Sequence, residues 1–255
     1  MGSTEDAARS VFGERADFYV TSPLHTEAAV LDRVVELARP EPGWRVLDIG
    51  TGAGHTALAL APLVAGVVAQ DLTPEMLDRA RELGAQRGVV NVRFVEGDVH
   101  HLDFPDGAFD LVTCRRAAHH FADIERALQE IWRVLRPGGR VVIDDRSVPP
   151  DPSADAALNR LDVLHDRSHV REYAASEWVE MLTGADFTVE SVETYTRHRP
   201  LTAFTDGVDE ATANEIHAVV DGFSEELRRA LDVREVDGQL HVDHWFVMAA
   251  ALRPG

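Results

Sequence analysis

The sequence contains no lysine, so all 25 basic residues among its 255 are arginine. This absence excludes Schiff-base chemistry at a lysine and the lysine of a phosphate-binding P-loop. Acidic residues are in excess, with 44 Asp and Glu against the 25 arginines, which gives a net charge of −19. Because a nucleic-acid partner requires clustered cations, this balance argues against nucleic-acid binding.

Cysteine and long hydrophobic runs are also scarce. The single cysteine, Cys114, excludes an internal disulfide framework and a zinc cluster built from cysteines. No segment reaches the roughly 18 uninterrupted apolar residues of a membrane-spanning helix, and residues 1–6 lack the features of a signal peptide. We therefore expect a cytoplasmic protein without a membrane partner. Apolar residues still make up 45% of the chain, which is enough for a substantial core.

Short apolar runs alternate with helical patterns through the first 145 residues. This alternation is typical of an α/β protein with a parallel sheet, in which ligands bind at the carboxyl ends of the strands. Thr73 is expected to cap the helix that begins at Pro74, and Pro137-Gly138-Gly139 to end a later helix. The expected strands are 44–49, 66–70, 92–95, 109–113 and 140–143, then 187–196 and 240–250 around a helical insertion at 208–231. Further helices are expected at 26–38, 154–165 and 176–183.

A glycine-rich loop, Gly50-Thr51-Gly52-Ala53-Gly54, follows the first strand. Glycine permits a tight turn and lets a ligand approach the backbone, and the next helix offers unpaired N–H groups. The spacing of Gly52, Gly54 and Ala57 also fits a dinucleotide fingerprint, which leaves an NAD(P)-dependent oxidoreductase as an alternative. If residues 52–57 were that fingerprint, its first glycine, Gly52, would lie several residues beyond the end of the strand. Asp48 would also repel a pyrophosphate, whereas it would favour a cationic amino-acid ligand.

Two more acids follow the next two strands. Asp71 ends the second strand, where its carboxylate can accept hydrogen bonds from both hydroxyls of a ribose. Asp98 follows the third strand and can accept a hydrogen bond from an adenine amino group. Each acid alone is typical of a solvated strand end. Together with Asp48, at the ends of three successive strands, they indicate one site for a nucleoside-containing cofactor.

These motifs, taken in order, resemble the class I S-adenosylmethionine-dependent methyltransferases, in particular the small-molecule group that includes the ubiquinone and menaquinone biosynthesis C-methyltransferases. The resemblance covers roughly residues 12–145. It implies a doubly wound, mostly parallel sheet of seven strands in the order 3-2-1-4-5-7-6, with the last strand antiparallel. Its motifs are residues 46–54, Asp71 with residues 73–77, Gly97-Asp98, residues 102–105, residues 109–112 and residues 135–139.

The resemblance further implies a single domain over residues 1–255. Residues 1–40 would form lid helices, residues 41–146 the cofactor-binding core, and residues 147–255 the acceptor-side helices and final strands. The cofactor would be S-adenosylmethionine, with S-adenosylhomocysteine as its product. The residues expected to contact it are Tyr19, Asp48, Gly50, Gly52, Gly54, Asp71, Leu72, Met76, Asp98, Val99 and Arg115.

The acceptor side offers candidate bases instead of a fixed catalytic motif. Methyl transfer mainly requires alignment of the nucleophile, exclusion of water and, for some acceptors, removal of a proton. His119 and His120 follow the fourth strand, and histidine is the natural base at neutral pH. Adjacent residues of a helix point about 100° apart, so we expect at most one of the two to face the acceptor. For the same reason we expect no shared metal ion.

The segments after strands four and five depart from the quinone enzymes. Residues 115–120 read Arg-Arg-Ala-Ala-His-His and residues 144–146 read Asp-Asp-Arg, so the quinone acceptor is not implied. Two adjacent arginines and the polar stretch 165–172 favour a polar or anionic small molecule. The sequence therefore predicts a small-molecule O-, N- or C-methyltransferase. A second alternative is a protein of this fold that binds the cofactor without transferring methyl, and the oligomeric state is not predicted.

Overall fold

The computed structural model describes residue 6, residues 9–13, residue 20 and residues 26–255. The strands of this part of the chain form one sheet in the order β3-β2-β1-β4-β5-β8-β6, with β7 paired to β8. β1 to β5 are parallel, and β8 runs antiparallel to both β5 and β6. The strands are β1 Arg45–Ile49, β2 Gly66–Asp71, β3 Val92–Glu96, β4 Phe109–Arg115, β5 Leu135–Ser147, β6 Thr188–Pro200, β7 Arg234–Val236 and β8 Gln239–Leu252.

This topology confirms the α/β class, the strand order and the antiparallel last strand. The difference is β7, a short eighth strand that the sequence analysis missed. It forms a hairpin with β8 through Asp237 and Gly238, which have φ of 51° and 77°. An Asp-Gly pair with positive φ at both positions is a favoured two-residue hairpin turn, so the signal for β7 was present in the sequence.

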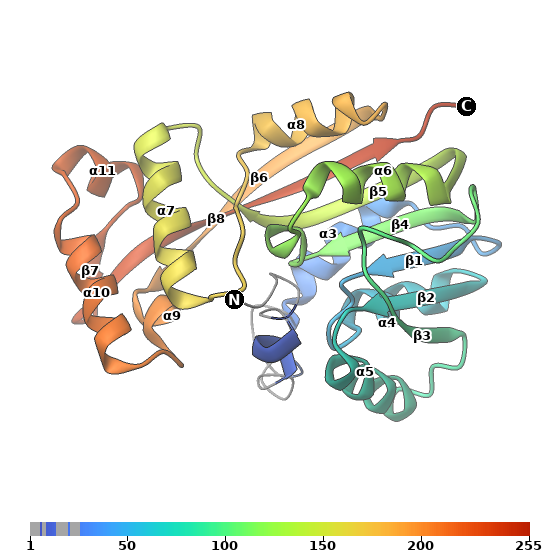
Figure 1. The fold of residues 1–255 in the computed structure, drawn as a ribbon, viewed down its shortest axis with the longest axis horizontal. Helices are drawn as coiled ribbons and strands as arrows, with labels where there is room; N and C mark the ends of the chain where they lie inside the picture. Colours follow the sequence, from blue (N-terminus) through green and yellow to red (C-terminus); the bar gives the residue numbers. More distant parts are fainter. Residues whose placement is uncertain (1–5, 7–8, 14–19, 21–25) are drawn as a thin grey trace.

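Helices cover both faces of the sheet (Figure 1). Side chains alternate along each strand, so Val46 packs on one face of the sheet and Leu47 on the other. The core on the first face includes α3 (Ala28–Ala38) and α4 (His55–Leu60), and α5 (Pro74–Gln86) packs on β2 and β3. The core on the second face includes α6 (Ile124–Val134) and α8 (Ala175–Gly184). Two short 3₁₀ helices, Ala61–Leu63 and Ala118–His120, lie in the connections.

A third apolar cluster lies at the far end of β6 and β8. Figure 1 shows α7 (Pro152–His165), α9 (Thr202–Thr205), α10 (Glu210–Asp221) and α11 (Glu225–Ala230) gathered there, beyond the parallel strands. Its centre includes Phe204, Ile216 and Val242, which are fully buried. We call this group of helices the distal lobe. The expected insertion at 208–231 corresponds to α10 and α11.

The expected helix start at Thr73-Pro74 is confirmed without its capping bond, whereas the expected end of the later helix was wrong. The helix before Pro137-Gly138-Gly139 ends at Val134, and Leu135 already begins β5. The guanidinium of Arg253 donates hydrogen bonds to the carbonyls of Trp132, Arg133 and Leu135, which satisfies this helix end without the glycines. Thr73 occupies the N-cap position of α5 but makes no side-chain capping bond. Its amide is instead held by Asp71, at 2.9 Å.

Within the described residues, no helix is both long enough and apolar enough to cross a membrane.

Candidate active site

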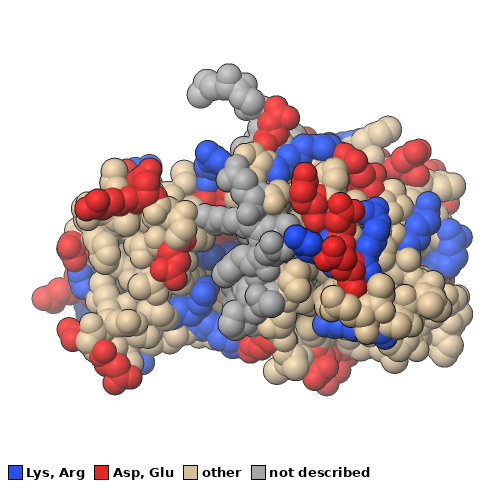
Figure 2. All heavy atoms as spheres, turned by 90° about the horizontal axis from the view of Figure 1, so that it is seen from below, with Lys and Arg blue, Asp and Glu red and all other residues tan. Residues whose placement is uncertain are grey.

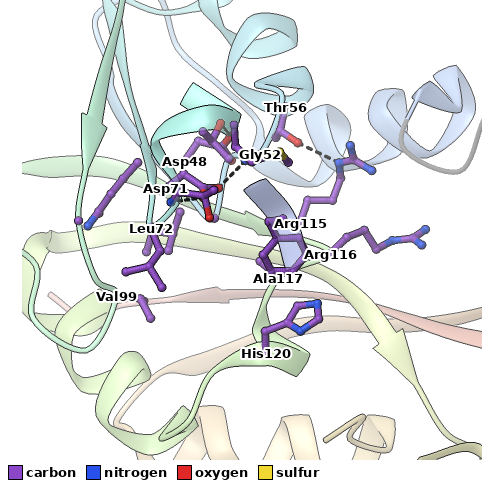
Figure 3. A pocket seen from close by; sticks show the side chains of 18 of the residues that line it. Asp48, Gly52, Thr56, Asp71, Leu72, Val99, Arg115, Arg116, Ala117 and His120 are labelled. Carbon is purple, nitrogen blue, oxygen red and sulfur yellow. Dashed lines mark hydrogen bonds between the residues drawn. The ribbon is translucent and has the colours of Figure 1, made fainter. Parts of the chain in front are cut away.

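A pocket opens at the carboxyl ends of the parallel strands (Figure 3). It encloses about 1000 Å³ when its open mouth is included. Its walls come from the glycine loop after β1, the ends of β2 and β4, and the segments that follow β3 and β4. The lining residues include Phe12, Asp48, residues 49–53, His55, Thr56, residues 70–73, Met76, residues 97–100, residues 115–117, His120 and Phe121.

The glycine loop is shaped by close packing as well as by its turn. Gly50 has φ of 57°, and a Cβ there would stand only 2.5 Å from the Cβ of Ala117. A side chain at residue 50 would therefore push the segment after β4 away from the pocket. Gly54 has φ of 84° and would place a Cβ 3.0 Å from that of Ala80 on α5. It lies outside the pocket lining, so its geometry serves helix packing.

Asp48 is 1% exposed and lies at the base of the pocket. The hydroxyls of Thr51 and Thr113 donate to its two carboxylate oxygens, at 2.5 and 2.6 Å. Burial raises the pKa of Asp48, and these two hydrogen bonds act in the opposite direction. The carboxylate is thus rigidly held below the glycine loop.

Asp71 joins the glycine loop to the start of α5. Its carboxylate accepts the amide of Gly52 at 2.7 Å and the amide of Thr73 at 2.9 Å, one on each oxygen. Burial raises the pKa of Asp71, and both amides oppose that rise. An ionised carboxylate has about four acceptor positions, so each oxygen keeps the capacity to accept a further hydrogen bond from a ligand.

Asp98 is held by a neighbouring histidine that the sequence analysis missed. Nδ1 of His100 lies 2.7 Å from Oδ1 of Asp98, and the amide of Asp123 donates to Nε2 of His100 at 3.1 Å. Nε2 therefore accepts, and Nδ1 carries the proton that is donated to Asp98. Oδ2 of Asp98 remains available to a ligand, and Val99 and Phe121 line the pocket beside it.

The remaining wall suits a nucleoside. Leu72, Met76 and Val99 supply apolar surface between Asp71 and Asp98. Oε1 of Gln70, which is buried at the pocket, has no hydrogen-bond partner within the described chain. A buried acceptor without a donor is costly, and a donor on a ligand would satisfy it. S-adenosylmethionine, with ribose hydroxyls and amino groups, fits this set of acceptors.

Two buried arginines form the wall opposite Asp71 (Figure 3). Nε of Arg115 donates to Oγ1 of Thr56 at 2.9 Å. Arg116 has φ of 56° and forms an ion pair with Asp144, with Nε 3.0 Å from Oδ2. Its guanidinium also donates to the hydroxyl of Tyr195 at 2.8 Å and stacks 3.9 Å from the ring of Phe246. Arg115 is one of the cofactor residues expected from the sequence, and Arg116 lines the same pocket.

The two histidines face different surroundings. His119 does not line the pocket: its Nδ1 lies 2.5 Å from Oδ1 of Asp145, and its amide donates to Oδ2 at 2.9 Å. Burial lowers the pKa of His119 well below its ordinary value. His120 lines the pocket, and its ring meets that of Phe12 edge-on at 4.8 Å. Nδ1 of His120 lies 3.2 Å from Oγ of Ser168.

Most of the predicted site residues therefore come together in one pocket. Asp48, Gly50, Gly52, Asp71, Leu72, Met76, Asp98, Val99, Arg115 and His120 line it, whereas Gly54 and His119 lie behind it. Tyr19 lies outside the described residues. The residues that the sequence analysis did not assign to the pocket include Thr56, Gln70 and His100. Their positions next to Gly54, Asp71 and Asp98 were the available signal.

Comparison with known proteins identifies the family. Residues 47–143 match the model of the methyltransferase domain. Over 182 residues the chain is 41% identical to the uncharacterized methyltransferase YcgJ of Bacillus subtilis, a match that covers 71% of this chain and 72% of that protein. The crystal structure of YcgJ has a TM-score of 0.83 at 33% identity and covers 88% of this chain and 98% of that one.

Two further relatives agree. A putative methyltransferase from Bacillus halodurans, BH2331, has a TM-score of 0.86 at 30% identity and covers 89% of this chain and all of its own. The demethylmenaquinone methyltransferase of Thermus thermophilus is 47% identical over 120 residues, which is 46% of this chain and 54% of that enzyme. The chain thus matches about half the length of this quinone enzyme.

These matches argue against the nicotinamide-dependent oxidoreductase that the spacing of Gly52, Gly54 and Ala57 left open. They agree with the strand order, the glycine loop and the acids at the strand ends. The chain belongs to the class I methyltransferases, which transfer a methyl group from S-adenosylmethionine.

Proposed function

We propose that the pocket holds the cofactor with its nucleoside between Asp71 and Asp98 and its amino-acid end near Asp48. Asp71 would accept hydrogen bonds from the ribose hydroxyls, and Asp98 from the adenine amino group. The buried charge of Asp48 would attract the ammonium group. Leu72, Met76 and Val99 supply the apolar walls for the base. The support for this arrangement is that the carboxylate oxygens of Asp48, Asp71 and Asp98 can each accept a hydrogen bond from the cofactor.

The bound cofactor supplies a methyl group on a positively charged sulfur, which a nucleophile attacks in line. The chain must then align the acceptor, keep water out and receive any proton that the acceptor loses. His120 is the residue in position for the last task, because it lines the pocket on the side away from Asp71 (Figure 3). This position of His120 is the observation that carries the proposed mechanism. The ring of Phe12 packs edge-on against that of His120.

His119 has a supporting role in this proposal. Its ring lies 4.0 Å from that of His120, between centroids, while its Nδ1 is occupied by Asp145. It therefore positions the 3₁₀ turn that carries His120 and does not itself contact the acceptor. With Nδ1 of His119 bound by Asp145, no metal ion shared by the two histidines enters this mechanism.

The acceptor in this proposal is a polar or anionic small molecule, and the enzyme acts in the cytoplasm. Arg115 and Arg116 bring two guanidinium groups to the pocket wall, which favours a ligand with acceptor oxygens. On the face drawn in Figure 2, acidic and basic side chains are interspersed. A nucleic-acid substrate would instead require a continuous basic surface.

The test is transfer of a labelled methyl group from S-adenosylmethionine to a metabolite extract, followed by separation of small molecules from macromolecules. We expect label in the small-molecule fraction with the native protein and a strong reduction with His120→Ala. Label found only in protein or nucleic acid would contradict the proposed substrate class. Full transfer by His120→Ala would contradict the role of the histidine.

A further inference from the structure

A group of buried cationic and neutral donors lies on one face of the sheet beyond the cofactor pocket. On this face Arg146 of β5 is paired with Phe246 of β8, and Val242 of β8 with Arg199 of β6. His244 lies between Val242 and Phe246 on the same side of β8, because side chains alternate along a strand. Arg116 reaches this face from the end of β4 and stacks on Phe246.

Two donor atoms of this group have no partner within the described chain. Nη1 of Arg116 is buried and makes no hydrogen bond, although the rest of its guanidinium is bound by Asp144 and Tyr195. His244 is 1% exposed, and its Nδ1 faces Nη2 of Arg146 at 3.4 Å. Because arginine only donates, Nδ1 of His244 accepts and its Nε2 carries a proton. That Nε2 is buried without an acceptor.

One of the three arginines in the group lacks an ion-pair partner. Arg116 is paired with Asp144, and Arg146 is paired with Asp162 and Glu172. Arg199 is partly exposed and forms no hydrogen bond or ion pair with any described residue. Burial and the positive charges of Arg146 and Arg116 lower the pKa of Arg199 to about 10. It thus remains charged at neutral pH, without an ion-pair partner.

Burying the two donor atoms of Arg116 and His244 without acceptors is costly, and native proteins rarely leave such groups unsatisfied. A ligand that accepts hydrogen bonds from both donors and pairs with Arg199 would carry several acceptor oxygens and negative charge. An oxyanion, a carboxylate or a phosphate group, has both properties and is the preferred partner of the planar guanidinium fork. Asp162 and Asp206 are the acids whose charges act on Arg199, yet neither forms an ion pair with it.

We propose that Arg116, Arg146, Arg199 and His244 form an oxyanion site that binds the anionic group of the methyl acceptor. We call these four residues the oxyanion site. This inference rests on the proposed function, because Arg116 lines the pocket that would hold the cofactor and links that pocket to the site. The acceptor would extend from His120, where its nucleophile reacts, toward β6 and the distal lobe. The enzyme would thus select acceptors that carry a carboxylate or a phosphate.

The first experiment measures binding of simple oxyanions without any methyl transfer. The full chain, saturated with S-adenosylhomocysteine, is titrated by calorimetry with inorganic phosphate, pyrophosphate and acetate at neutral pH and low salt. We expect at least one of them to bind, and Arg199→Gln to weaken this binding by about tenfold to a hundredfold, since hydrogen bonds to a charged group are lost. Arg199→Lys, which keeps the charge, should restore part of the affinity.

The matched control is Arg160→Gln, which changes the net charge equally. Arg160 is half-exposed on α7 and pairs with Glu215. We expect its replacement to leave oxyanion affinity within twofold of the native value. Absence of binding by all three anions, or equal weakening by Arg199→Gln and Arg160→Gln, would overturn the proposal. Unchanged affinity of Arg199→Gln for S-adenosylhomocysteine would show that its fold and cofactor site are intact.

The second experiment tells a phosphate from a carboxylate on the acceptor. It also distinguishes failure of the oxyanion site from failure of the proposed methyl transfer. A metabolite extract is treated with phosphatase before the labelled-methyl assay. Loss of labelled product would assign a phosphate ester, whereas retention together with binding of the product to an anion exchanger would assign a carboxylate. A labelled product that is neutral or cationic before and after treatment would overturn the oxyanion site while leaving methyl transfer intact. A protein that binds oxyanions but methylates no small molecule would instead contradict the proposed function.

Discussion

Nδ1 of His119 lies 2.5 Å from Oδ1 of Asp145, and this contact separates the roles of two adjacent histidines. The pair withdraws His119 from the pocket, so that of these two histidines only His120 lies in its wall. A 3₁₀ turn places the two side chains in different directions. Of the two adjacent imidazoles, that of His120 therefore faces the pocket, and that of His119 positions the turn behind it.

This separation predicts different kinetics for the two variants. His120→Ala should lower kcat by about 10²–10⁴ if the ring acts as a general base. His119→Asn, whose amide nitrogen can replace Nδ1 as a donor to Asp145, should change kcat little. Neither change should alter the affinity for S-adenosylmethionine. Steady-state kinetics with an identified acceptor provide the measurement, and equal losses in the two variants would contradict the assignment.

Methyl transfer should be independent of a metal ion. In the proposed mechanism His120 acts alone, and Nδ1 of His119 is occupied by Asp145. We therefore expect full activity after dialysis against EDTA. Loss of activity that a divalent ion restores would show that a metal takes part.

The ion pair of Arg116 and Asp144 should stabilise the fold, because both side chains are at most 3% exposed. Arg116→Met would leave the carboxylate of Asp144 buried with only Tyr195 as a side-chain donor. We expect a loss of about 3–5 kcal/mol in the free energy of unfolding. The double variant with Asp144→Asn should recover part of this loss. Urea unfolding measures the free energy of unfolding of the single and the double variant. Arg81→Met, on the exposed side of α5, is the control, and we expect it to change this free energy little.

The stability of the protein should depend on the pH through His169. Burial lowers the pKa of His169 from 6.5 to about 3. Below pH 6.5 the unfolded chain therefore binds a proton that the native state excludes, and the contribution of this group falls as the pH falls. His169→Gln removes the effect, so the stability of the variant relative to the native protein should improve by about 1–2 kcal/mol between pH 7 and pH 5. Urea unfolding gives the free energy of unfolding of both proteins at each pH. The same difference between variant and native protein at pH 7 and pH 5 would contradict this prediction.

The sequence predicted the parallel strands and the cofactor wall because local patterns determine them. Alternating apolar runs located β1 to β5, and Asp48, Asp71 and Asp98 marked the ends of β1 to β3. The carboxyl ends of parallel strands meet at one edge, so the pocket followed from the topology. The end of α6 could not be predicted, because Arg253, more than a hundred residues away, satisfies its carbonyls.

Long-range pairing also hid the donors on the acceptor side. Arg146, Arg199 and His244 lie on three strands that become neighbours only through the order β5-β8-β6. No local spacing relates these residues in the sequence. The roles of His119 and His120 were likewise ambiguous, because the choice depends on Asp145 at the end of another strand.

Calorimetric titration of the protein with S-adenosylhomocysteine, alongside NADH, decides whether the pocket is a site for the methyl donor. We expect binding of the first and none of the second. Asp71→Asn should weaken binding by about 1–3 kcal/mol, since charge-assisted hydrogen bonds to the ribose are lost. Asp78→Asn on the exposed side of α5 serves as the control and should leave the affinity unchanged. Preference for NADH, or unchanged affinity in Asp71→Asn, would contradict the assignment of this pocket to S-adenosylmethionine.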